Sequence, residues 1–300
     1  MSILVVGTVA LDTIQTPFGR VRNALGGSAA YSAVSASFFS KVKLVSIAGK
    51  DFPQQFISFF QSRDIDTKGL QIKKGRTFRW SGSYTYELNS AQTLKTELNL
   101  LSHFNPTLAG DYQNEKFVFL ANINPRIQLE VLKQLKGTRL VVSDTMNYWI
   151  EHEKETLKRV IKRSDIFILN DSEARELTCE SNLIKAARAL LALGPRLVIV
   201  KKGEYGCSLF SRTFSFYVPA YLLENVLDPT GAGDTFAGGF LGYLAARPKI
   251  TESALKKAVA LGTIMSSYVV EDFSLERLRK LNKRDIRVRF KDFQRMTNFK

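Results

Sequence analysis

The chain has 300 residues, of which 45% are hydrophobic and 24% are charged. These proportions are ordinary for a globular protein, so they exclude wholesale disorder and allow a large buried core. No uncharged apolar run approaches the roughly 20 residues that a membrane-spanning helix needs, so we expect no membrane partner. The formal net charge of +15 predicts a surface that attracts polyanions.

The N-terminal residues predict a buried strand and not a targeting segment. MSILVVGTVALD has no basic residue ahead of its apolar stretch and meets Asp12 soon afterwards, so we expect no signal peptide. The two cysteines, Cys179 and Cys207, are too few for a disulfide framework or for a zinc site with thiolate ligands. A reducing compartment follows, and we expect the protein to be cytoplasmic.

Short apolar runs alternate with helical patterns along most of the chain. The pattern predicts buried strands at 3–9, 42–48, 117–121, 140–143, 166–169 and 197–201, and helices near 28–38, 53–63, 126–136, 153–163, 171–178 and 183–193. Strands that alternate with helices indicate βαβ units. The expected fold is therefore α/β, with a doubly wound, mostly parallel sheet flanked by helices.

The stretch 69–97 breaks this alternation. It is rich in Thr, Tyr, Phe and Trp, and its polar and apolar residues alternate, which predicts antiparallel strands. We expect segment 13–22 to pair with it, so that the two build a small sheet projecting from the main domain as a lid. A projecting sheet with an apolar face covers a ligand pocket or another subunit, and we expect a homodimer through this sheet.

The C-terminal third begins with a predicted hairpin at 207–218 and continues with helices at 232–246 and 252–270. The last segment, 276–300, has ten Lys/Arg and three Asp/Glu, a net charge of +7. Its apolar residues recur at helical spacing, which predicts basic amphipathic helices packed on the body. Nucleic-acid contact is the other interpretation. We do not expect it, because the segment lacks interleaved aromatic residues and any recognised module.

Residues 228–240, DPTGAGDTFAGGF, carry most of the functional information. Gly231, Ala232 and Gly233 form a turn of small residues that opens into a helix, whose free N–H groups and positive dipole end suit a phosphate. Asp234 lies in the same turn, where a carboxylate could accept the proton of an attacking hydroxyl. An anion cradle beside a general base predicts phosphoryl transfer to an alcohol. The alternative is that Asp234 only caps the helix.

This string resembles the second signature of the ribokinase-like (PfkB-type) carbohydrate kinase family, and the resemblance spans nearly the whole chain. Gly26 and Gly27, placed before a helix, resemble the first signature, in which a di-glycine meets the sugar. Asp12 matches the carboxylate that binds substrate hydroxyls. Asn170 and Glu173 are similar to the element that organises magnesium and phosphate, although taken alone they favour a helix N-cap with a capping box.

The resemblance also implies a nucleotide site. No Walker loop is present in the sequence, so the phosphates would lie on the 230–234 turn and the adenine against the 252–270 helix. Lys201, at the end of a predicted strand, could reach a phosphate, or it could be an ordinary solvated lysine. The expected ATP contacts are Asn170, Glu173, Lys201, Gly203, Gly206, Thr230, Val259 and Gly262.

The implied protein is a single ribokinase-like kinase domain over residues 1–300 that phosphorylates a sugar hydroxyl with ATP and Mg²⁺. In this interpretation Asp234 is the general base, and the backbone N–H groups of Gly231, Ala232 and Gly233 stabilise the transferred phosphoryl group. Glu173 would hold Mg²⁺ through water. The family also suggests a monovalent cation such as K⁺ near Asp228.

Departures from the family pattern leave the acceptor open. Many sugar-specific members carry Asn where this chain has Tyr31, and an aromatic ring could stack on a base or close a pocket around a smaller sugar. The lid has further aromatic residues, which also suit a nucleoside, so an adenosine-type nucleoside kinase is the alternative. Asn122 and Asp144, at the ends of predicted strands, could add polar contacts. A third hypothesis is a basic nucleic-acid or partner-binding protein on a kinase fold, but the intact Asp234 turn favours the enzyme.

Overall fold

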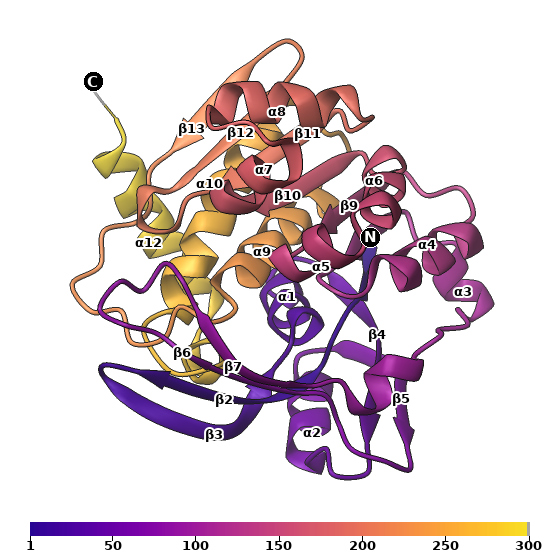
Figure 1. Cartoon of the computed structure of the whole chain (residues 1–300). Coiled ribbons are helices and arrows are strands. Elements are labelled where there is room, and N and C mark those ends of the chain that lie inside the picture. Colours follow the sequence, from indigo (N-terminus) through magenta and orange to yellow (C-terminus); the bar gives the residue numbers. More distant parts are fainter. Residues whose placement is uncertain (299–300) are drawn as a thin grey trace.

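The computed structural model describes residues 1–298, and a nine-stranded sheet forms its centre (Figure 1). Seven neighbouring strands run parallel, and the hairpin of β12 and β13 extends one edge antiparallel. In spatial order the strands are β13 (Ser215–Val218), β12 (Cys207–Ser211), β11 (Leu197–Lys201), β10 (Ile166–Asn170), β9 (Leu140–Asp144), β8 (Phe117–Leu120), β1 (Ser2–Val6), β4 (Lys41–Gly49) and β5 (Ile65–Lys73).

Successive side chains of each central strand enter different hydrophobic clusters. Ile3 and Val5 of β1 pack in one cluster, whereas Leu4 and Val6 pack in another. A strand whose two faces are both buried reads as a continuous apolar run. The sheet is therefore covered by helices on both sides, as the sequence predicts.

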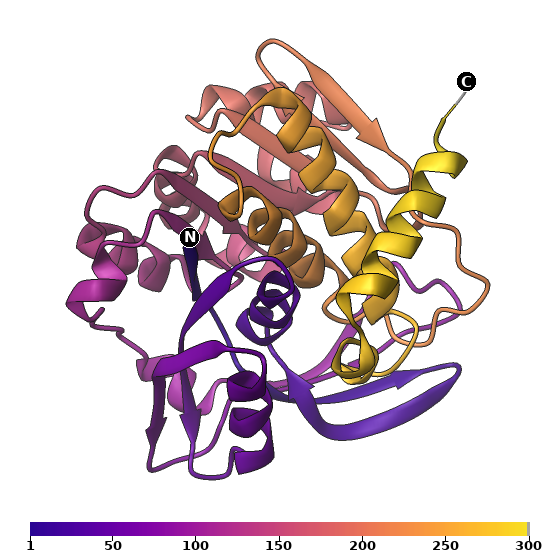
Figure 2. The same cartoon turned by 180° about the vertical axis from the view of Figure 1, so that it is seen from behind.

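The first face carries the helices that Figure 2 shows in front of the sheet. They are α1 (Ser28–Ser37), α2 (Gln54–Ser62), α9 (Ala232–Ala245), α10 (Glu252–Val269), α11 (Glu276–Lys280) and α12 (Lys283–Met296). The opposite face carries the 3-10 helix η1 (Asn99–His103), α3 (Gly110–Gln113), α4 (Pro125–Gln134), α5 (Asn147–His152), α6 (Lys154–Lys162), α7 (Asp171–Thr178) and α8 (Leu183–Ala192). Among the described residues, no helix has the length and apolar character needed to cross a membrane.

Helix α9 lies between α1 and α10, and its glycines allow that close packing. A Cβ atom on Gly238 would come 2.2 Å from the Ser32 carbonyl oxygen of α1, and one on Gly239 would come 2.8 Å from Met265 of α10. Only a residue without a side chain fits at such distances. This packing fixes the start of α9 against the carboxyl edge of the sheet.

The lid is a separate four-stranded sheet, in the order β3 (Gly19–Gly26), β2 (Ala10–Thr16), β6 (Arg79–Ser83) and β7 (Gln92–Glu97), and Figure 1 shows it beneath the body. Its outer pairs are antiparallel, as predicted, but the central pair of β2 and β6 is parallel. Dimerisation through this sheet stays a prediction.

Two predicted boundaries are wrong. Residues 69–73 belong to the main sheet and not to the lid, because β5 pairs with β4 along its length. The first strand ends at Val6 and not at residue 9, where the chain turns towards the lid. The predicted basic helices of 276–300 form as α11 and α12, and the last two positions of that segment lie outside the described residues.

Candidate active site

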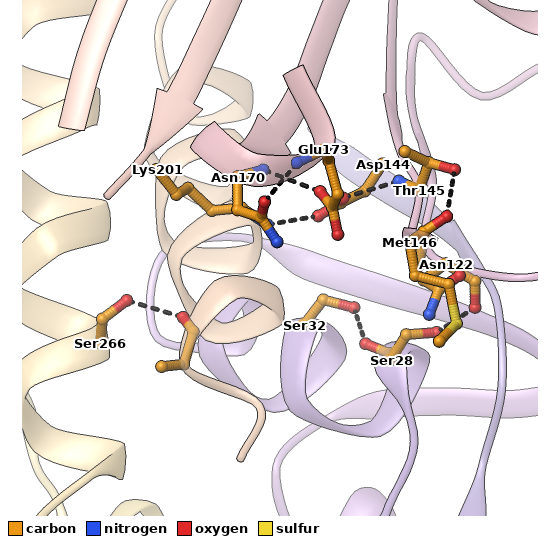
Figure 3. Close-up of polar contacts among 12 residues, drawn as sticks. Ser28, Ser32, Asn122, Asp144, Thr145, Met146, Asn170, Glu173, Lys201 and Ser266 are labelled. Atoms are coloured by element: carbon orange, nitrogen blue, oxygen red, sulfur yellow. Dashed lines mark hydrogen bonds and ion pairs between the residues drawn. The ribbon is translucent and has the colours of Figure 1, made fainter. Parts of the chain in front are cut away.

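Three polar side chains end three neighbouring parallel strands at one edge of the sheet. They are Asp144 of β9, Asn170 of β10 and Lys201 of β11. Asn170 and Lys201 are paired in register. The carboxyl edge of an open parallel sheet is where such folds bind ligands. Figure 3 shows these side chains gathered there, above the helices of the first face.

The start of α9 faces the same edge. Gly231 adopts a left-handed conformation with φ 77°, and a Cβ atom there would come within 2.5 Å of the Tyr31 ring. A Cβ atom on Gly233 would come 2.7 Å from Lys201 Nζ. Small residues thus bring the lysine against the free N–H groups of the helix, and both attract an anion.

Asp234 lies in the first turn of α9 and is partly exposed, whereas the helix is buried from Thr235 onward. Removal from bulk water raises the pKa of Asp234 to about 7, the nearby Asp144 carboxylate adds to this rise, and Lys201 opposes it. A carboxylate with a pKa near neutrality can exchange a proton with a substrate hydroxyl at physiological pH.

Lys201 is the cation of a buried acidic cluster. Its Nζ forms an ion pair of 3.0 Å with Asp144 Oδ2. Burial alone would lower the pKa of Lys201, but the carboxylates of Asp144, Glu173 and Asp234 outweigh it, so the pKa is raised. The predicted alternative of a solvated lysine is therefore wrong. One ammonium group faces three carboxyl groups, so the cluster has more acidic oxygens than cations to pair with them, and a metal ion could bind there.

Glu173 satisfies the capping interpretation of its motif. Its Oε2 accepts from the Asn170 backbone N–H at 2.8 Å, and Asn170 Oδ1 accepts from the Glu173 N–H at 2.8 Å, which completes a capping box at the start of α7. Burial raises the pKa of Glu173 to about 8, with Lys201 opposing and Asp144 contributing.

The donor set suits Mg²⁺ held through water. Magnesium takes few protein ligands and keeps most of its water, so it needs a carboxylate-rich edge and not a cage of side chains. Residues 1–298 contain no group of three or more His, Cys, Asp or Glu residues placed to ligate a metal directly. Glu173 and the other carboxyl groups around Lys201 fit the water-mediated arrangement.

The predicted acceptor residues are also brought together. A Cβ atom on Gly26 would come 1.8 Å from Asp12 Oδ2, so the glycine makes room for this carboxylate. Asp12 is 4% exposed, and its Oδ1 has no hydrogen-bond partner among residues 1–298. Burial, and next Asp228, raise the pKa of Asp12 to about 8. An orphaned, buried acceptor of this kind suits a ligand hydroxyl.

Tyr31 and Asn122 border the same region in different ways. Tyr31 is 1% exposed and its ring packs against Gly231. In this structure the ring therefore forms part of the wall beside the turn and offers no open face for stacking. Asn122 Oδ1 accepts from Trp149 Nε1 at 2.9 Å. Because an indole nitrogen only donates, this bond fixes the amide orientation and leaves the Asn122 NH₂ group to donate to a ligand.

Asp228 is fully buried beside the turn. Its Oδ1 accepts from the Thr230 N–H and its Oδ2 from the Ser274 N–H, both at 2.9 Å. Burial raises the pKa of this carboxyl. These two bonds account for the residue as an anchor of the 228–231 loop, and a monovalent cation near it stays a prediction.

The lid touches the predicted nucleotide side at two places. The hydroxyl of Tyr84, which follows β6, is 3.1 Å from Thr230 Oγ1. Asn89, in the loop between β6 and β7, donates from Nδ2 to Glu204 Oε1 at 3.1 Å and accepts from the Glu204 N–H at 3.3 Å. A Cβ atom on Gly203 would come 2.0 Å from Asn89 Oδ1, so this glycine accommodates the contact. We call the Asn89–Glu204 pair the lid latch.

Two predicted ATP contacts on α10 do not line the site. Val259 is fully buried, and a Cβ atom on Gly262 would come 2.8 Å from the Phe236 carbonyl oxygen of α9. Both residues pack α10 against α9, so neither faces a nucleotide in this structure. Gly206, another predicted contact, is buried at φ 81° and shapes the loop that follows β11.

The lid latch and the Asp144–Lys201 ion pair are absent from the sequence-based prediction. The sequence did indicate Asp144 as a candidate, because it comes at the end of an apolar strand, in the same way that Asp12 follows the first one. Asn89 carried none, since a polar residue in a long polar loop has no distinguishing pattern.

This fold and this site define a kinase of the ribokinase fold. Residues 2–277 match the model of the pfkB family carbohydrate kinases. The chain is also 33% identical over 269 residues to the cytidine kinase of Thermococcus kodakarensis, covering 87% of this chain and 93% of that protein. The chain therefore belongs to the PfkB family of carbohydrate kinases.

Other relatives agree with this assignment. The nucleoside kinase of Methanocaldococcus jannaschii is 25% identical over 261 residues, covering 86% of this chain and 82% of its own. Its crystal structure, that of an archaeal member of the ribokinase family, matches with a TM-score of 0.78 over 97% of this chain and 98% of that chain at 22% identity. The fructokinase of Vibrio cholerae O395, solved with fructose, ADP and calcium, matches with a TM-score of 0.79 at 18% identity, covering 96% and 98%.

Proposed function

We propose that this protein is a nucleoside kinase, which transfers the γ-phosphoryl group of ATP to a sugar hydroxyl of a nucleoside. The sequence alone favoured a free sugar and kept an adenosine-type nucleoside as the alternative. Similarity to a cytidine kinase along 87% of the chain supports the nucleoside and makes cytidine the first acceptor to test. The observation that carries the chemistry is Asp234, partly exposed at the helix start beside Lys201.

Asp234 is the proposed base. With a pKa of about 7, it is largely ionised at slightly alkaline pH and still basic enough to take the hydroxyl proton as the phosphoryl group moves. The N–H groups of Gly231 and Gly233 stabilise charge on the transferred group, and Lys201 approaches the same point. The Ala232 N–H, also expected from the sequence to contribute, donates instead to the Pro229 carbonyl oxygen at 3.2 Å. Asp234 and the anion-binding N–H groups lie in one helical turn. A substrate hydroxyl held there is therefore close to its base and to the phosphoryl group at the same time.

The acceptor lies between Asp12 and Asp234 in this proposal. The unpartnered Oδ1 of Asp12 accepts from a sugar hydroxyl, and the Asn122 NH₂ group donates to an acceptor atom of the same ligand. The lid, held at Tyr84 and Asn89, keeps water from competing with the acceptor.

Glu173, with the neighbouring Asp144 carboxylate, is the group that would hold Mg²⁺ through water. When bound, the metal would neutralise charge on the phosphate oxygens. Lys201 remains paired with Asp144 and keeps that carboxylate oriented at the strand end.

A coupled assay of ADP release tests the proposal with ATP and a panel of acceptors: cytidine, uridine, adenosine, inosine, ribose and fructose. We expect kcat/KM for at least one nucleoside to exceed that for both free sugars by at least about tenfold, because a base adds binding surface that a free sugar lacks. Faster turnover of ribose or fructose would replace the nucleoside with a sugar. No turnover of any acceptor would contradict the kinase itself.

A further inference from the structure

Helix α12 carries five cations that the kinase site does not use. They are exposed along the helix and are Lys283, Arg284, Arg287, Lys291 and Arg295. Across residues 1–298, none of the five forms an ion pair or a side-chain hydrogen bond, whereas Arg289 of the same helix, turned inward, pairs with Glu271. Figure 2 shows α12 in yellow at the outer side of the body, beside α10. We call these five side chains the α12 cationic face.

Most other helices within residues 1–298 that carry Lys or Arg contain an internal ion pair, the exception being α8 with Lys185 and Arg188. Five helices, α4, α6, α7, α10 and α11, each contain an ion pair between residues three or four positions apart. Such pairs stabilise a helix, whereas like charges at the same spacing destabilise it. The α12 helix contains two acids, but neither serves its cationic face. Asp285 completes the capping box with Asn282, and Asp292 accepts from the Tyr221 hydroxyl.

The placement of these cations works against the helix itself. Lys283 and Arg284 occupy its first turn, where the positive end of the helix dipole favours acids. Lys283, Arg287, Lys291 and Arg295 recur every four residues, so neighbouring like charges share one ridge. Folding does not explain this arrangement, which points to an external anion.

The geometry of the ridge indicates an extended anion. At 1.5 Å per residue, the four cations span about 18 Å of helix. The apolar residues Ile286 and Phe293 face the body and are buried. The cationic face thus presents charge along a line. The exposed large apolar residues of α12 are Val288 at 61% and Met296 at 42%, which is less apolar surface than a helix inserting into a lipid bilayer presents. Phe290 is partly buried against the core, so no fully exposed aromatic ring is there to stack on unpaired bases.

We propose that the α12 cationic face binds the phosphate backbone of a nucleic-acid duplex, without reading its sequence. This revises the expectation from the sequence, because contacts to phosphates need neither interleaved aromatic residues nor a recognised module. A duplex offers closely and regularly spaced negative charges, and contacts to them need only exposed Lys and Arg. This inference stands apart from the proposed kinase function, because the residues of the α12 cationic face lie outside the catalytic and binding groups described above.

Fluorescence anisotropy with the full chain and a labelled 20-base-pair DNA duplex of random sequence tests the proposal. If all five cations contact phosphates, the slope of log K against log salt is about −4.5, so raising salt from about 50 to 200 mM weakens binding roughly 500-fold. No binding at the lower salt concentration would overturn the proposal. Binding to vesicles containing phosphatidylserine but not to the duplex would replace the duplex with a membrane.

A pair of matched variants separates the α12 cationic face from net charge. Arg287→Gln with Lys291→Gln removes two cations from α12, and we expect the slope to fall by about 1.8. Lys185→Gln with Arg188→Gln removes two cations from α8, and we expect the slope to stay unchanged. Equal losses from the two variants would show a general charge effect and overturn the site. Circular dichroism confirms that each variant is folded.

Discussion

The acidic cluster at the carboxyl edge of the sheet and the α12 cationic face both gather like charges, but in opposite surroundings. In the acidic cluster, Asp144 and Glu173 are buried and share one ammonium group, and burial raises the pKa of each. On α12, the side chains stand in water without protein partners among the described residues. Like charge costs far more folding free energy where water is excluded than where the side chains stay hydrated.

This difference separates two kinds of function. The acidic cluster costs folding free energy, and in the proposed function its carboxyl groups serve a substrate proton or a metal ion. The α12 cationic face costs little folding free energy, and its contribution to binding is electrostatic attraction of an anion. Substitutions in the acidic cluster are therefore expected to change catalysis and stability strongly. Substitutions farther from it, such as those in the lid latch, are expected to have smaller effects.

The largest expected effect is on catalysis, from Asp234→Asn. Loss of a general base lowers kcat by about 10²- to 10⁴-fold, while the KM for ATP stays within about twofold, because the anion-binding turn is intact. Steady-state kinetics of the purified variant measure both constants. Asp171→Asn, at an exposed carboxylate of α7, is the matched control and leaves both unchanged. A collapse of ATP binding with normal kcat would show that Asp234 is structural.

Next is the buried ion pair. Lys201→Met leaves Asp144, whose side chain is 3% exposed, without its cation, and we expect a loss of about 3 kcal/mol in the free energy of unfolding at pH 8. Protonation of the unpaired carboxylates relieves the loss at pH 5. Urea denaturation at both pH values measures it. Adding Asp144→Asn to Lys201→Met recovers part of the stability. Without such recovery, the pair would not be the source of the effect.

Asp12 gives a pH-dependent test. Its pKa of about 8 in the folded protein exceeds its ordinary value of 3.8, so the folded state binds more protons and the free energy of unfolding falls as pH rises from about 4 to 8. Asp12→Asn removes this dependence. Its Tm should exceed that of the unaltered protein at pH 8 and approach it only near pH 4, while the KM for the acceptor rises. Asp64→Asn, at an exposed position, is the control in the same thermal melts, and an equal shift there would contradict the assignment.

The smallest predicted effect concerns the lid latch. Asn89→Ala removes two hydrogen bonds to Glu204, each worth about 1 kcal/mol, and we expect the KM for ATP to rise roughly three- to tenfold with a smaller change in kcat. Glu204→Gln keeps both the backbone N–H and a side-chain oxygen for Asn89, so its KM should move less. Equal kinetics for all three proteins would show that the latch does not reach the nucleotide site.

Local patterns predicted much of the fold and part of the site. The alternation of apolar runs and helical patterns correctly placed the central strands and their helices, because both periodicities are properties of neighbouring residues. The same logic put Asp12 beside Gly26 and Gly27. It failed for 69–73, where a strand pattern cannot say which sheet the strand joins. It also failed for Val259 and Gly262, whose burial depends on how closely α9 approaches α10.

By itself, the sequence determined the glycine-rich segment at 228–240 that opens a helix, the α/β class and the basic character of the C-terminal segment, since each depends on patterns along the chain. Only the tertiary structure decided that Lys201 pairs with Asp144, 57 residues away, and that the lid latch reaches the loop after β11. It also decided which cations of α12 face solvent unpaired. The physical reason is that burial and charge pairing depend on distances between segments, and chain order alone does not fix those distances.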